Sequence, residues 1–333
     1  RRYVGGQVTE DGSFLVITAA TSTTGNELYI QDLRKTNSPI LPVIQNFDND
    51  YSVIHSEGDK LFIETNFQAP NGRVMVMNIN SPAIESWKEL IPETENVLRI
   101  GSAGGKLFAN YLKDATSMVI QYSLDGTVDR EIDLPGIGSV GGFGGRNEDT
   151  ELYYTFTSYV YPPTIFRYSI AEGTSELYKE SGVKFDPENY ESKQVFYASK
   201  DGTKVPMIIT YKKGIKLDGT NPTMLYGYGG FNISLTPSFS TSNIVLLENG
   251  GVYAVANLRG GGEYGEEWHS AGTKMQKQNV FDDFIAAAEW LIENKYTSSE
   301  KLAIAGGSNG GLLVGATMTQ RPELMEVAFP AVG

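Results

Sequence analysis

The sequence contains no cysteine and only two histidines, His55 and His269, among its 333 residues. The absence of cysteine excludes disulfides, thiol nucleophiles and cysteine-ligated metal sites. Two histidines are too few for a histidine-rich zinc site, so we expect no bound metal. Basic residues are also scarce, because 27 Lys and Arg face 40 Asp and Glu, which gives a net charge of −13. A phosphate-binding surface needs clustered Lys and Arg, so we expect no nucleic-acid partner.

Long apolar runs are missing as well. No stretch approaches the roughly 20 apolar residues that cross a bilayer, so we expect a soluble protein with no membrane partner. Residues 1–6 do not have the pattern of a signal peptide, although an export signal further upstream stays open. A chain without cysteine is compatible with an exported bacterial enzyme. We therefore favour the periplasm over the cytoplasm as its compartment.

The most informative stretch that is present lies at residues 301–314. An apolar run at 302–305 predicts a buried strand, and residues 312–318 predict a helix. Between them the sequence Gly-Gly-Ser-Asn-Gly matches G-x-S-x-G, with the serine at Ser308. In a nucleophile elbow such a serine occupies a strained turn between strand and helix, where its hydroxyl is exposed. We expect the glycines at 306, 307, 310 and 311 to make room for crossing backbone; the alternative is a glycine-rich turn with an incidental serine.

The first half of the sequence predicts strand after strand. Short β-branched or aromatic runs are bounded by Gly, Asn, Asp or Pro at 14–17, 28–30, 61–63, 74–77, 118–120, 152–154 and 165–168. Four leucines that each follow a polar turn recur about 45 residues apart, at Leu15, Leu61, Leu107 and Leu152. That is the period of a four-stranded propeller blade. We predict about four blades of a ring expected to have seven, with His55 on a blade strand or loop.

The pattern changes near residues 181–187. A hairpin is predicted at 194–197 and 205–210, followed by buried strands at 223–226 and 252–257. One apolar stripe over 281–292 predicts a helix, with Asp282 and Asp283 in its positive first turn. Alternating strands and helices indicate a mainly parallel sheet. We therefore predict a partial β-propeller domain at 1–182 and the first half of an α/β-hydrolase domain at 183–333.

A second glycine pattern competes with this interpretation. Gly260, Gly262 and Gly265 match the dinucleotide fingerprint G-x-G-x-x-G, and Asp282 and Asp283 follow roughly 20 residues later. We expect no helix to open at the third glycine, and the acidic pair begins a helix instead of ending a strand. A glutamate in the turn would also repel a pyrophosphate. We therefore interpret these glycines as a tight loop on the active-site side of the sheet.

Three segments together carry a resemblance to a known family. Residues 225–232 read Leu-Tyr-Gly-Tyr-Gly-Gly-Phe-Asn, residues 257–265 read Asn-Leu-Arg-Gly-Gly-Gly-Glu-Tyr-Gly, and residues 306–314 contain the elbow. In this order they resemble the prolyl oligopeptidase family, serine peptidases in which a propeller packs over an α/β-hydrolase domain. The resemblance runs from the predicted blades to Gly333.

The resemblance implies roles for four residues. Ser308 matches the family nucleophile, and Tyr228 matches the tyrosine whose hydroxyl forms the oxyanion hole with the backbone N–H of Asn309. Phe231 matches an aromatic residue that lines the proline pocket. Physical chemistry is consistent with these roles, since a phenol can donate to an oxyanion and an aromatic wall suits a flat pyrrolidine ring. The alternative for Tyr228 and Phe231 is ordinary core packing after a strand.

The implied activity is hydrolysis of short peptides on the C-terminal side of proline, with no cofactor. The sequence departs from the family in extent, because α/β-hydrolases place an Asp or Glu and then a His after the serine, and no His follows Ser308. We expect these residues after Gly333 and interpret His269 as structural. The chain then resembles an internal fragment, whose partners are upstream blades and the second half of the hydrolase domain; we expect the complete protein to be a monomer.

Two other functions stay open at this point. The first is a different α/β-hydrolase, such as an esterase or another oligopeptidase. The second is a propeller interaction module with a vestigial hydrolase. Cleavage of a proline-linked amide would separate the predicted peptidase from the first, and labelling of Ser308 by a fluorophosphonate would separate both enzymes from the second.

Overall fold

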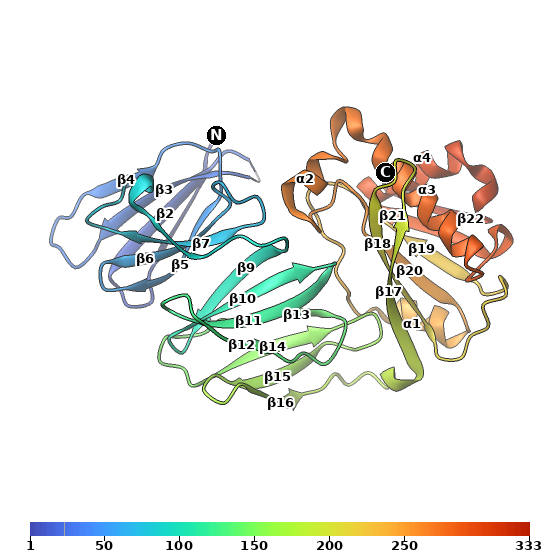
Figure 1. Cartoon of the computed structure of the whole chain (residues 1–333), viewed down its shortest axis with the longest axis horizontal. Coiled ribbons are helices and arrows are strands. Elements are labelled where there is room, and N and C mark those ends of the chain that lie inside the picture. The colour runs from blue at the N-terminus through green and yellow to red at the C-terminus, as the bar shows by residue number, and fades with distance from the viewer. Residues whose placement is uncertain (23) are drawn as a thin grey trace.

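The computed structural model describes residues 1–22 and 24–333, and it places them in two lobes (Figure 1). The lobe of residues 1–179 holds four antiparallel sheets of four strands each, and chain order equals spatial order within every sheet. We refer to these sheets as blades 1 to 4. Blade 1 consists of β1 (Tyr3–Val8), β2 (Phe14–Ala20), β3 (Asn26–Asp32) and β4 (Ile40–Ile44), and blade 2 of β5 (Tyr51–Glu57), β6 (Lys60–Thr65), β7 (Arg73–Asn78) and β8 (Lys88–Ile91).

Blades 3 and 4 repeat the same meander. Blade 3 consists of β9 (Val97–Ala103), β10 (Lys106–Lys113), β11 (Thr116–Ser123) and β12 (Val128–Ile132), and blade 4 of β13 (Ser139–Gly141), β14 (Glu151–Thr157), β15 (Thr164–Ser169) and β16 (Thr174–Lys179). The four spaced leucines of the sequence all lie at the start of the second strand of a blade, in β2, β6, β10 and β14. The partial β-propeller predicted from this period is confirmed.

Each pair of neighbouring blades shares a hydrophobic core. Alternate side chains of one strand point to opposite faces of its sheet. In β6, Leu61 and Ile63 are buried in the core shared with blade 1, whereas Phe62 is buried in the core shared with blade 3. A third core, centred on Phe108 and Tyr154, joins blades 3 and 4. This two-sided burial explains why the blade strands read as apolar runs with little alternation.

The second lobe is built on a sheet of six strands in the order β17-β18-β20-β19-β21-β22. The β17–β18 hairpin and β20 are antiparallel, and the pairs β20–β19, β19–β21 and β21–β22 are parallel. The mainly parallel part is the start of the predicted α/β-hydrolase fold. The strands are β17 (Tyr190–Ala198), β18 (Lys204–Lys212), β19 (Thr223–Tyr226), β20 (Val252–Ala256), β21 (Leu302–Gly307) and β22 (Val327–Ala331).

Four α-helices accompany this sheet: α1 (Thr241–Glu248), α2 (Gly265–Ser270), α3 (Gln278–Glu293) and α4 (Asn309–Gln320). α3 and α4 pack on one face, where they bury Phe284 and Leu313 against β18, β19 and β20. α1 packs on the other face through Ile244 and Leu247. Short 3-10 turns lie at Ile84–Ser86, Pro187–Asn189, Lys274–Gln276, Ser299–Lys301 and Pro322–Leu324. None of the helices in the described residues has the length and apolar character needed to cross a membrane.

Two local predictions in this lobe are wrong. α3 begins at Gln278, before the expected start, so Asp282 and Asp283 lie in its second turn and not in its first. Asp283 is fully buried, and its carboxylate forms an ion pair with Arg259. α2 does begin at Gly265, so the expected absence of a helix there was not a valid argument against dinucleotide binding.

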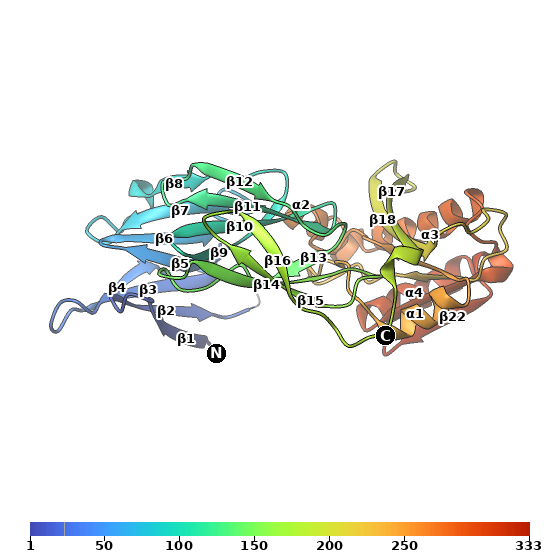
Figure 2. The ribbon, with the colours of Figure 1, turned by 90° about the horizontal axis from the view of Figure 1, so that it is seen from below.

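The two lobes contact each other along the loops of blades 3 and 4 (Figures 1 and 2). The Tyr159 ring packs edge-on against Tyr253 of β20, with 5.6 Å between the ring centroids. The Tyr264 hydroxyl donates to Asp114 Oδ1 at 2.8 Å, and the Phe239 N–H donates to Thr157 Oγ1 at 3.3 Å. The propeller therefore contacts β20 itself, the loop that follows β20 and the segment before α1.

Candidate active site

Ser308 joins a strand to a helix through a strained turn. β21 ends at Gly307, α4 begins at Asn309, and Ser308 between them has φ 55° and ψ −118°. A positive φ is uncommon for residues other than glycine, and such strain is concentrated at functional sites. The Ser308 side chain is exposed in the described structure. This local geometry is that of a nucleophile elbow.

Close backbone contacts around the turn explain most of its glycines. A Cβ on Gly306 would lie 2.5 Å from the Gly310 carbonyl oxygen, and a Cβ on Gly310 would lie 2.7 Å from the Gly227 carbonyl oxygen. Gly311 is equally close to the Ala331 carbonyl. The expectation for Gly307 was wrong, because nothing lies within 4 Å of its Cβ position. The turn therefore needs glycine on the helix side and at 306, but not immediately before the serine.

Tyr228 lies beside the start of α4 because its strand is the neighbour of β21. β19 and β21 are parallel, with Tyr226 opposite Ala305, so the segments after both strands emerge at the same edge of the sheet. The side-chain amide of Asn309 donates from Nδ2 to the Tyr228 carbonyl oxygen. The structure thus brings Tyr228 close to Ser308 and Asn309, although Tyr228 lies about 80 positions before them in the sequence.

Two hydrogen-bond donors in this cluster are free among the described residues. Asn309 is the first residue of α4, so its backbone N–H has no helical acceptor, and no other backbone acceptor is within reach. The Tyr228 phenol is half-buried and makes no side-chain hydrogen bond in the part of the chain that the structure describes. The positive end of the α4 dipole lies at the same place. The Asn309 N–H, which is next to Ser308 in the chain, can stabilise negative charge that develops there.

Phe231 lies on the loop after Tyr228 and is 74% exposed, with φ 55°. Its ring is therefore not part of a core among residues 1–22 and 24–333. His269 contacts the same loop. Its Nδ1 lies 2.8 Å from the Gly260 carbonyl oxygen and 3.1 Å from the Asn232 backbone nitrogen. One tautomer donates to Gly260 and the other accepts from Asn232. Within the described residues, neither His269 nor His55 hydrogen-bonds to Ser308.

Arg259 anchors the glycine-rich loop that follows β20. Its guanidinium forms ion pairs with Asp283 of α3 and with Asp201 of the β17–β18 turn, both at 2.6 Å. The Ser199 hydroxyl donates to Asp283 at 2.6 Å. Hydrogen bonds from Arg259 hold the pKa of the Asp201 carboxyl well below its usual range. Asp283 is committed to Arg259 and is therefore not available to bind a nucleotide ribose, and Asp282 lies inside α3 and not at the end of a strand, where the dinucleotide fingerprint needs its acidic residue.

Glu263 is buried inside the same loop. Its Oε1 accepts from the Leu235 N–H at 2.9 Å and from Asn257 Nδ2 at 3.2 Å, whereas Oε2 has no partner among the described residues. Burial raises the pKa of Glu263 to about 7, although the bond from Leu235 opposes this effect. The carboxyl therefore links residue 235 to this loop. With a pKa of about 7, it is protonated in a fraction of the molecules near neutral pH.

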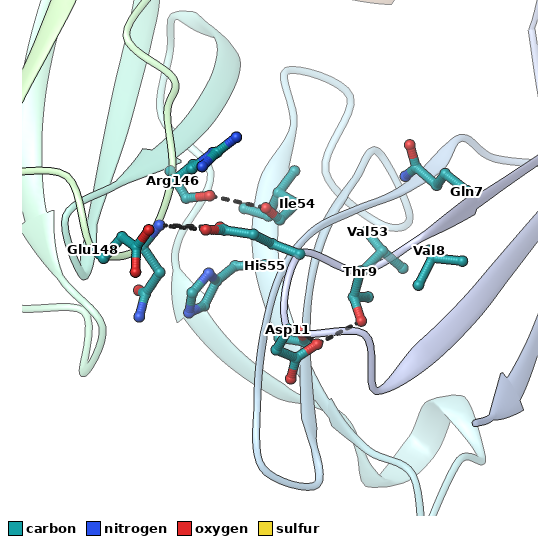
Figure 3. A pocket seen from close by; sticks show the side chains of 13 residues that line it. Gln7, Val8, Thr9, Asp11, Val53, Ile54, His55, Arg146 and Glu148 are labelled. Atoms are coloured by element: carbon teal, nitrogen blue, oxygen red, sulfur yellow. Dashed lines mark hydrogen bonds between the residues drawn. The ribbon is translucent and has the colours of Figure 1, made fainter. Parts of the chain in front are cut away.

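A cavity of about 790 Å³ lies in the propeller lobe, away from Ser308. Its walls come from the inner strands and turns of the blades, and they include Glu10, Asp11, His55, Arg146 and Glu148 (Figure 3). Glu10 spans it by accepting a hydrogen bond from the Asn147 N–H at 2.8 Å. His55 lies on β5, as predicted, and burial lowers its pKa. Among residues 1–22 and 24–333, no three His, Asp or Glu side chains are grouped so that they could hold a metal ion.

Comparison with known proteins identifies the two lobes. The family model described as "Prolyl oligopeptidase, N-terminal beta-propeller domain" matches residues 1–181, and the model "Prolyl oligopeptidase family" matches residues 237–333. The chain belongs to the prolyl oligopeptidase family. It is 57% identical over 333 residues to a prolyl endopeptidase of Elizabethkingia miricola and 41% identical over 306 residues to one of Dictyostelium discoideum.

Members of the prolyl oligopeptidase family also share the structure. A solved prolyl endopeptidase has 44% identity to this chain and a TM-score of 0.90, and the match covers 98% of this chain and 48% of that one. Prolyl oligopeptidase B from Galerina marginata, bound to a 25mer macrocyclization substrate, has 34% identity and a TM-score of 0.91 over 99% of this chain and 47% of that one.

The chain spans about half the length of the family members that it matches. All of it aligns with the Elizabethkingia miricola enzyme but covers 47% of that protein, and 87% of it aligns with 40% of the Dictyostelium discoideum enzyme.

One further residue of the candidate site, Lys277, was not predicted from the sequence. Lys277 precedes α3, and its ammonium donates to the Gly229 carbonyl oxygen at 2.8 Å and to Asn309 Oδ1 at 3.1 Å. A signal was present in the sequence, because a lysine at the start of a helix is opposed by the positive end of the helix dipole. Such a residue needs another partner, and only the folded structure shows which one.

Proposed function

We propose that the complete protein containing this chain is a serine endopeptidase that hydrolyses short peptides on the C-terminal side of proline through an acyl-enzyme on Ser308. The observation that supports this most strongly is the strained elbow at Ser308 with two free donors, the Asn309 N–H and the Tyr228 phenol, at the same edge of the sheet. Membership of the prolyl oligopeptidase family supports the choice of a peptide bond after proline as the substrate.

The mechanism follows from these groups. Ser308 Oγ attacks the carbonyl carbon of the proline residue, and its proton passes to a base. The carbonyl oxygen becomes an oxyanion that accepts hydrogen bonds from Asn309 N–H and Tyr228 Oη. The C–N bond then breaks, the amine leaves with a proton, and the acyl group stays on Ser308. Water hydrolyses this ester and restores the serine. No cofactor is needed for these steps.

The general base of this mechanism is expected outside residues 1–333. A catalytic base must lie within hydrogen-bond reach, roughly 2.6–3.2 Å, of the proton that it removes. His269 Nδ1 is hydrogen-bonded to the Gly260 carbonyl oxygen, and His55 lies in the propeller. We expect the Asp and His after residue 333, and we expect residues 1–333 expressed alone to show no turnover of a proline-linked amide. Turnover that Ser308→Ala abolishes would instead place the base within this chain.

We further propose a domain boundary at residues 182–183. The last propeller strand, β16, ends at Lys179, and the first strand of the hydrolase sheet, β17, begins at Tyr190. The propeller family model ends at residue 181, which supports the same boundary. A propeller that contacts the loops after β20 would confine the approach to Ser308, so we expect oligopeptides to be cleaved and folded proteins to be spared.

The deciding experiment uses the protein at its natural length. It should hydrolyse a proline-linked amide reporter, lose this activity in Ser308→Ala, and be labelled by a fluorophosphonate only when Ser308 is present. Labelling with ester hydrolysis but without proline-amide cleavage would favour another α/β-hydrolase. Failure of both reactions in the folded protein would favour a propeller interaction module.

A further inference from the structure

Lys277 links the two segments that carry the proposed oxyanion donors. Its Nζ donates to the Gly229 carbonyl oxygen at 2.8 Å and to Asn309 Oδ1 at 3.1 Å. Asn309 in turn donates from Nδ2 to the Tyr228 carbonyl oxygen. One ammonium and one amide therefore connect the loop after β19 to the first residue of α4.

The position of Lys277 is unfavourable by ordinary criteria. It is the N-cap of α3, where the helix dipole repels a positive charge, and the first turn of α3 contains no acidic residue. No carboxylate forms a salt bridge with it in the part of the chain that the structure describes. Burial lowers the pKa of Lys277. Among the described residues, the only side-chain hydrogen bonds of Nζ are those to Gly229 and Asn309, and both partners belong to the candidate active site.

The backbone of Lys277 is held firmly relative to these partners. α3 packs into the main core of the hydrolase lobe through Val280 and Phe284, which are fully buried. Val280 lies directly against Gly229. A Cβ added to Gly230 would lie only 2.5 Å from the Asn309 side-chain amide nitrogen, so this amide is packed closely against Gly230. The lysine therefore connects a helix anchored in the core to a loop that is packed closely against α3 and α4.

We propose that Lys277 is a positioning residue that holds the Asn309 N–H and the Tyr228 phenol at the separation needed to donate to one oxyanion. This inference rests on the proposed function of Ser308, Asn309 and Tyr228. Two donors serve the same oxygen only if each lies about 2.7–3.1 Å from it. Here the donors come from segments 81 residues apart, so a tertiary link must set their separation.

A different role for a half-buried lysine is that of general base, as in Ser-Lys hydrolases. The geometry favours positioning, because Nζ donates to two oxygens and makes no hydrogen bond to Ser308 within the described residues. Substitution of Lys277 by arginine distinguishes the two roles. Arginine stays protonated and can donate two hydrogen bonds, so it can position but cannot act as a base.

The test compares Lys277→Met with Lys277→Arg in the protein at its natural length. We expect Lys277→Met to lower kcat by roughly 10-fold to 10²-fold with little change in KM, since a misplacement of about 1 Å can cost about 10²-fold. Lys277→Arg should recover part of this loss. A peptide aldehyde ending in proline, whose hemiacetal oxygen would occupy the oxyanion position, should lose affinity by the same factor as kcat/KM. Lys274→Met is the control, because Lys274 is exposed in the neighbouring turn.

A double-mutant cycle separates positioning from a general effect on folding. In a Tyr228→Phe background only one donor remains to be aligned, so Lys277→Met should lower kcat much less there than in the parent enzyme. Asn309→Ala keeps the backbone N–H but removes the amide link. It should reproduce the loss of kcat on its own, so the proposal stays testable even if Lys277→Met fails to fold.

Several results would overturn the proposal. The first is a kcat for Lys277→Met within twofold of the parent. The second is an equal loss of kcat on Lys277→Met in the parent and Tyr228→Phe backgrounds. The third is complete inactivity of a folded Lys277→Arg enzyme, which would indicate that Lys277 is a base. Failure of the proposed function gives a different result, namely turnover that persists in Ser308→Ala.

Discussion

Arg259 and Asp283 form an ion pair from which solvent is excluded, with Nη2 2.6 Å from Oδ1 and side chains that are 6% and 0% exposed. The Arg259 backbone N–H donates to the same carboxylate at 3.1 Å. The pair fixes the loop after β20 to the second turn of α3. It therefore holds in place the backbone on which His269 and the Phe231 loop rest.

Removing one partner of this pair should destabilise the fold strongly. Arg259→Met would leave the Asp283 carboxylate buried without its counter-charge, and we expect the free energy of unfolding to fall by about 3–5 kcal/mol. Urea unfolding of the natural-length protein measures this change. Arg167→Met is the matched control, because Arg167 pairs with Glu176 at the surface, and it should destabilise the fold much less. Equal losses for both variants would contradict the role of the buried pair.

Removal of the Tyr228 hydroxyl tests the oxyanion site. Tyr228→Phe keeps the ring and deletes one of two donors, so we expect kcat to fall by roughly 10²–10³-fold with a smaller effect on KM. Steady-state kinetics on a proline-linked amide measure both constants. Tyr178→Phe, an exposed tyrosine of blade 4, provides the control. An unchanged kcat in Tyr228→Phe would remove Tyr228 from the site.

Phe231 should contribute to selectivity. Burying a proline ring against an aromatic wall contributes on the order of 1–3 kcal/mol, so Phe231→Ala should lower kcat/KM for proline more than for alanine at the cleaved position. Paired reporters that differ only at that residue measure the ratio. Phe196→Ala, at a 40% exposed position of β17, should leave the ratio unchanged. Equal losses for both substrates would mean that Phe231 only supports its loop.

Glu263 should make stability depend on pH. Burial raises its pKa from 4.5 to about 7, so between these pH values the folded protein binds more protons than the unfolded chain. Stability from this group is fully present below about pH 4.5 and is lost as the pH rises through about 7. Tyr159, which interacts with Glu263, stays neutral here because burial raises its pKa further above 10. The loss should be on the order of 3 kcal/mol.

Glu263→Gln is the variant that isolates this effect. Glutamine keeps the shape and an oxygen acceptor but cannot ionise, so its free energy of unfolding relative to the parent should increase between pH 5 and pH 8. Denaturant titrations at the two pH values measure the difference. A difference between parent and variant that does not change with pH would show that Glu263 is not responsible.

Much of this fold could be predicted because its signals are local. The spacing of Leu15, Leu61, Leu107 and Leu152 reports a repeat whose unit is one blade. Leu61, Leu107 and Leu152 are buried between neighbouring blades, whereas Leu15 of blade 1 is half-buried. The elbow was equally predictable, since the strained turn at Ser308 needs a strand before it, a helix after it and small residues around it within ten positions. For the same reason the hairpin of β17 and β18 was located correctly.

Local signals were misleading where one residue had several possible partners. Asp283 was expected to serve the dipole of α3, yet it lies in the second turn and binds Arg259. Gly307 was expected to relieve crowding, yet only Gly306 and the glycines after Ser308 meet crossing backbone. The short helix at Gly265 was missed because its six residues contain no apolar stripe.

The sequence by itself determined the classes of element, their order and the identity of Ser308 as the residue in the elbow, because these follow from periodicity and turn chemistry over short windows. Only the tertiary structure decided how the site is assembled. Strand order β20-β19-β21 places the loop after Tyr226 beside the start of α4, and this proximity lets Lys277 and Asn309 connect them. Hydrogen bonds and ion pairs between segments 24 to 81 residues apart depend on which strands are neighbours, and that is settled by packing of the whole sheet.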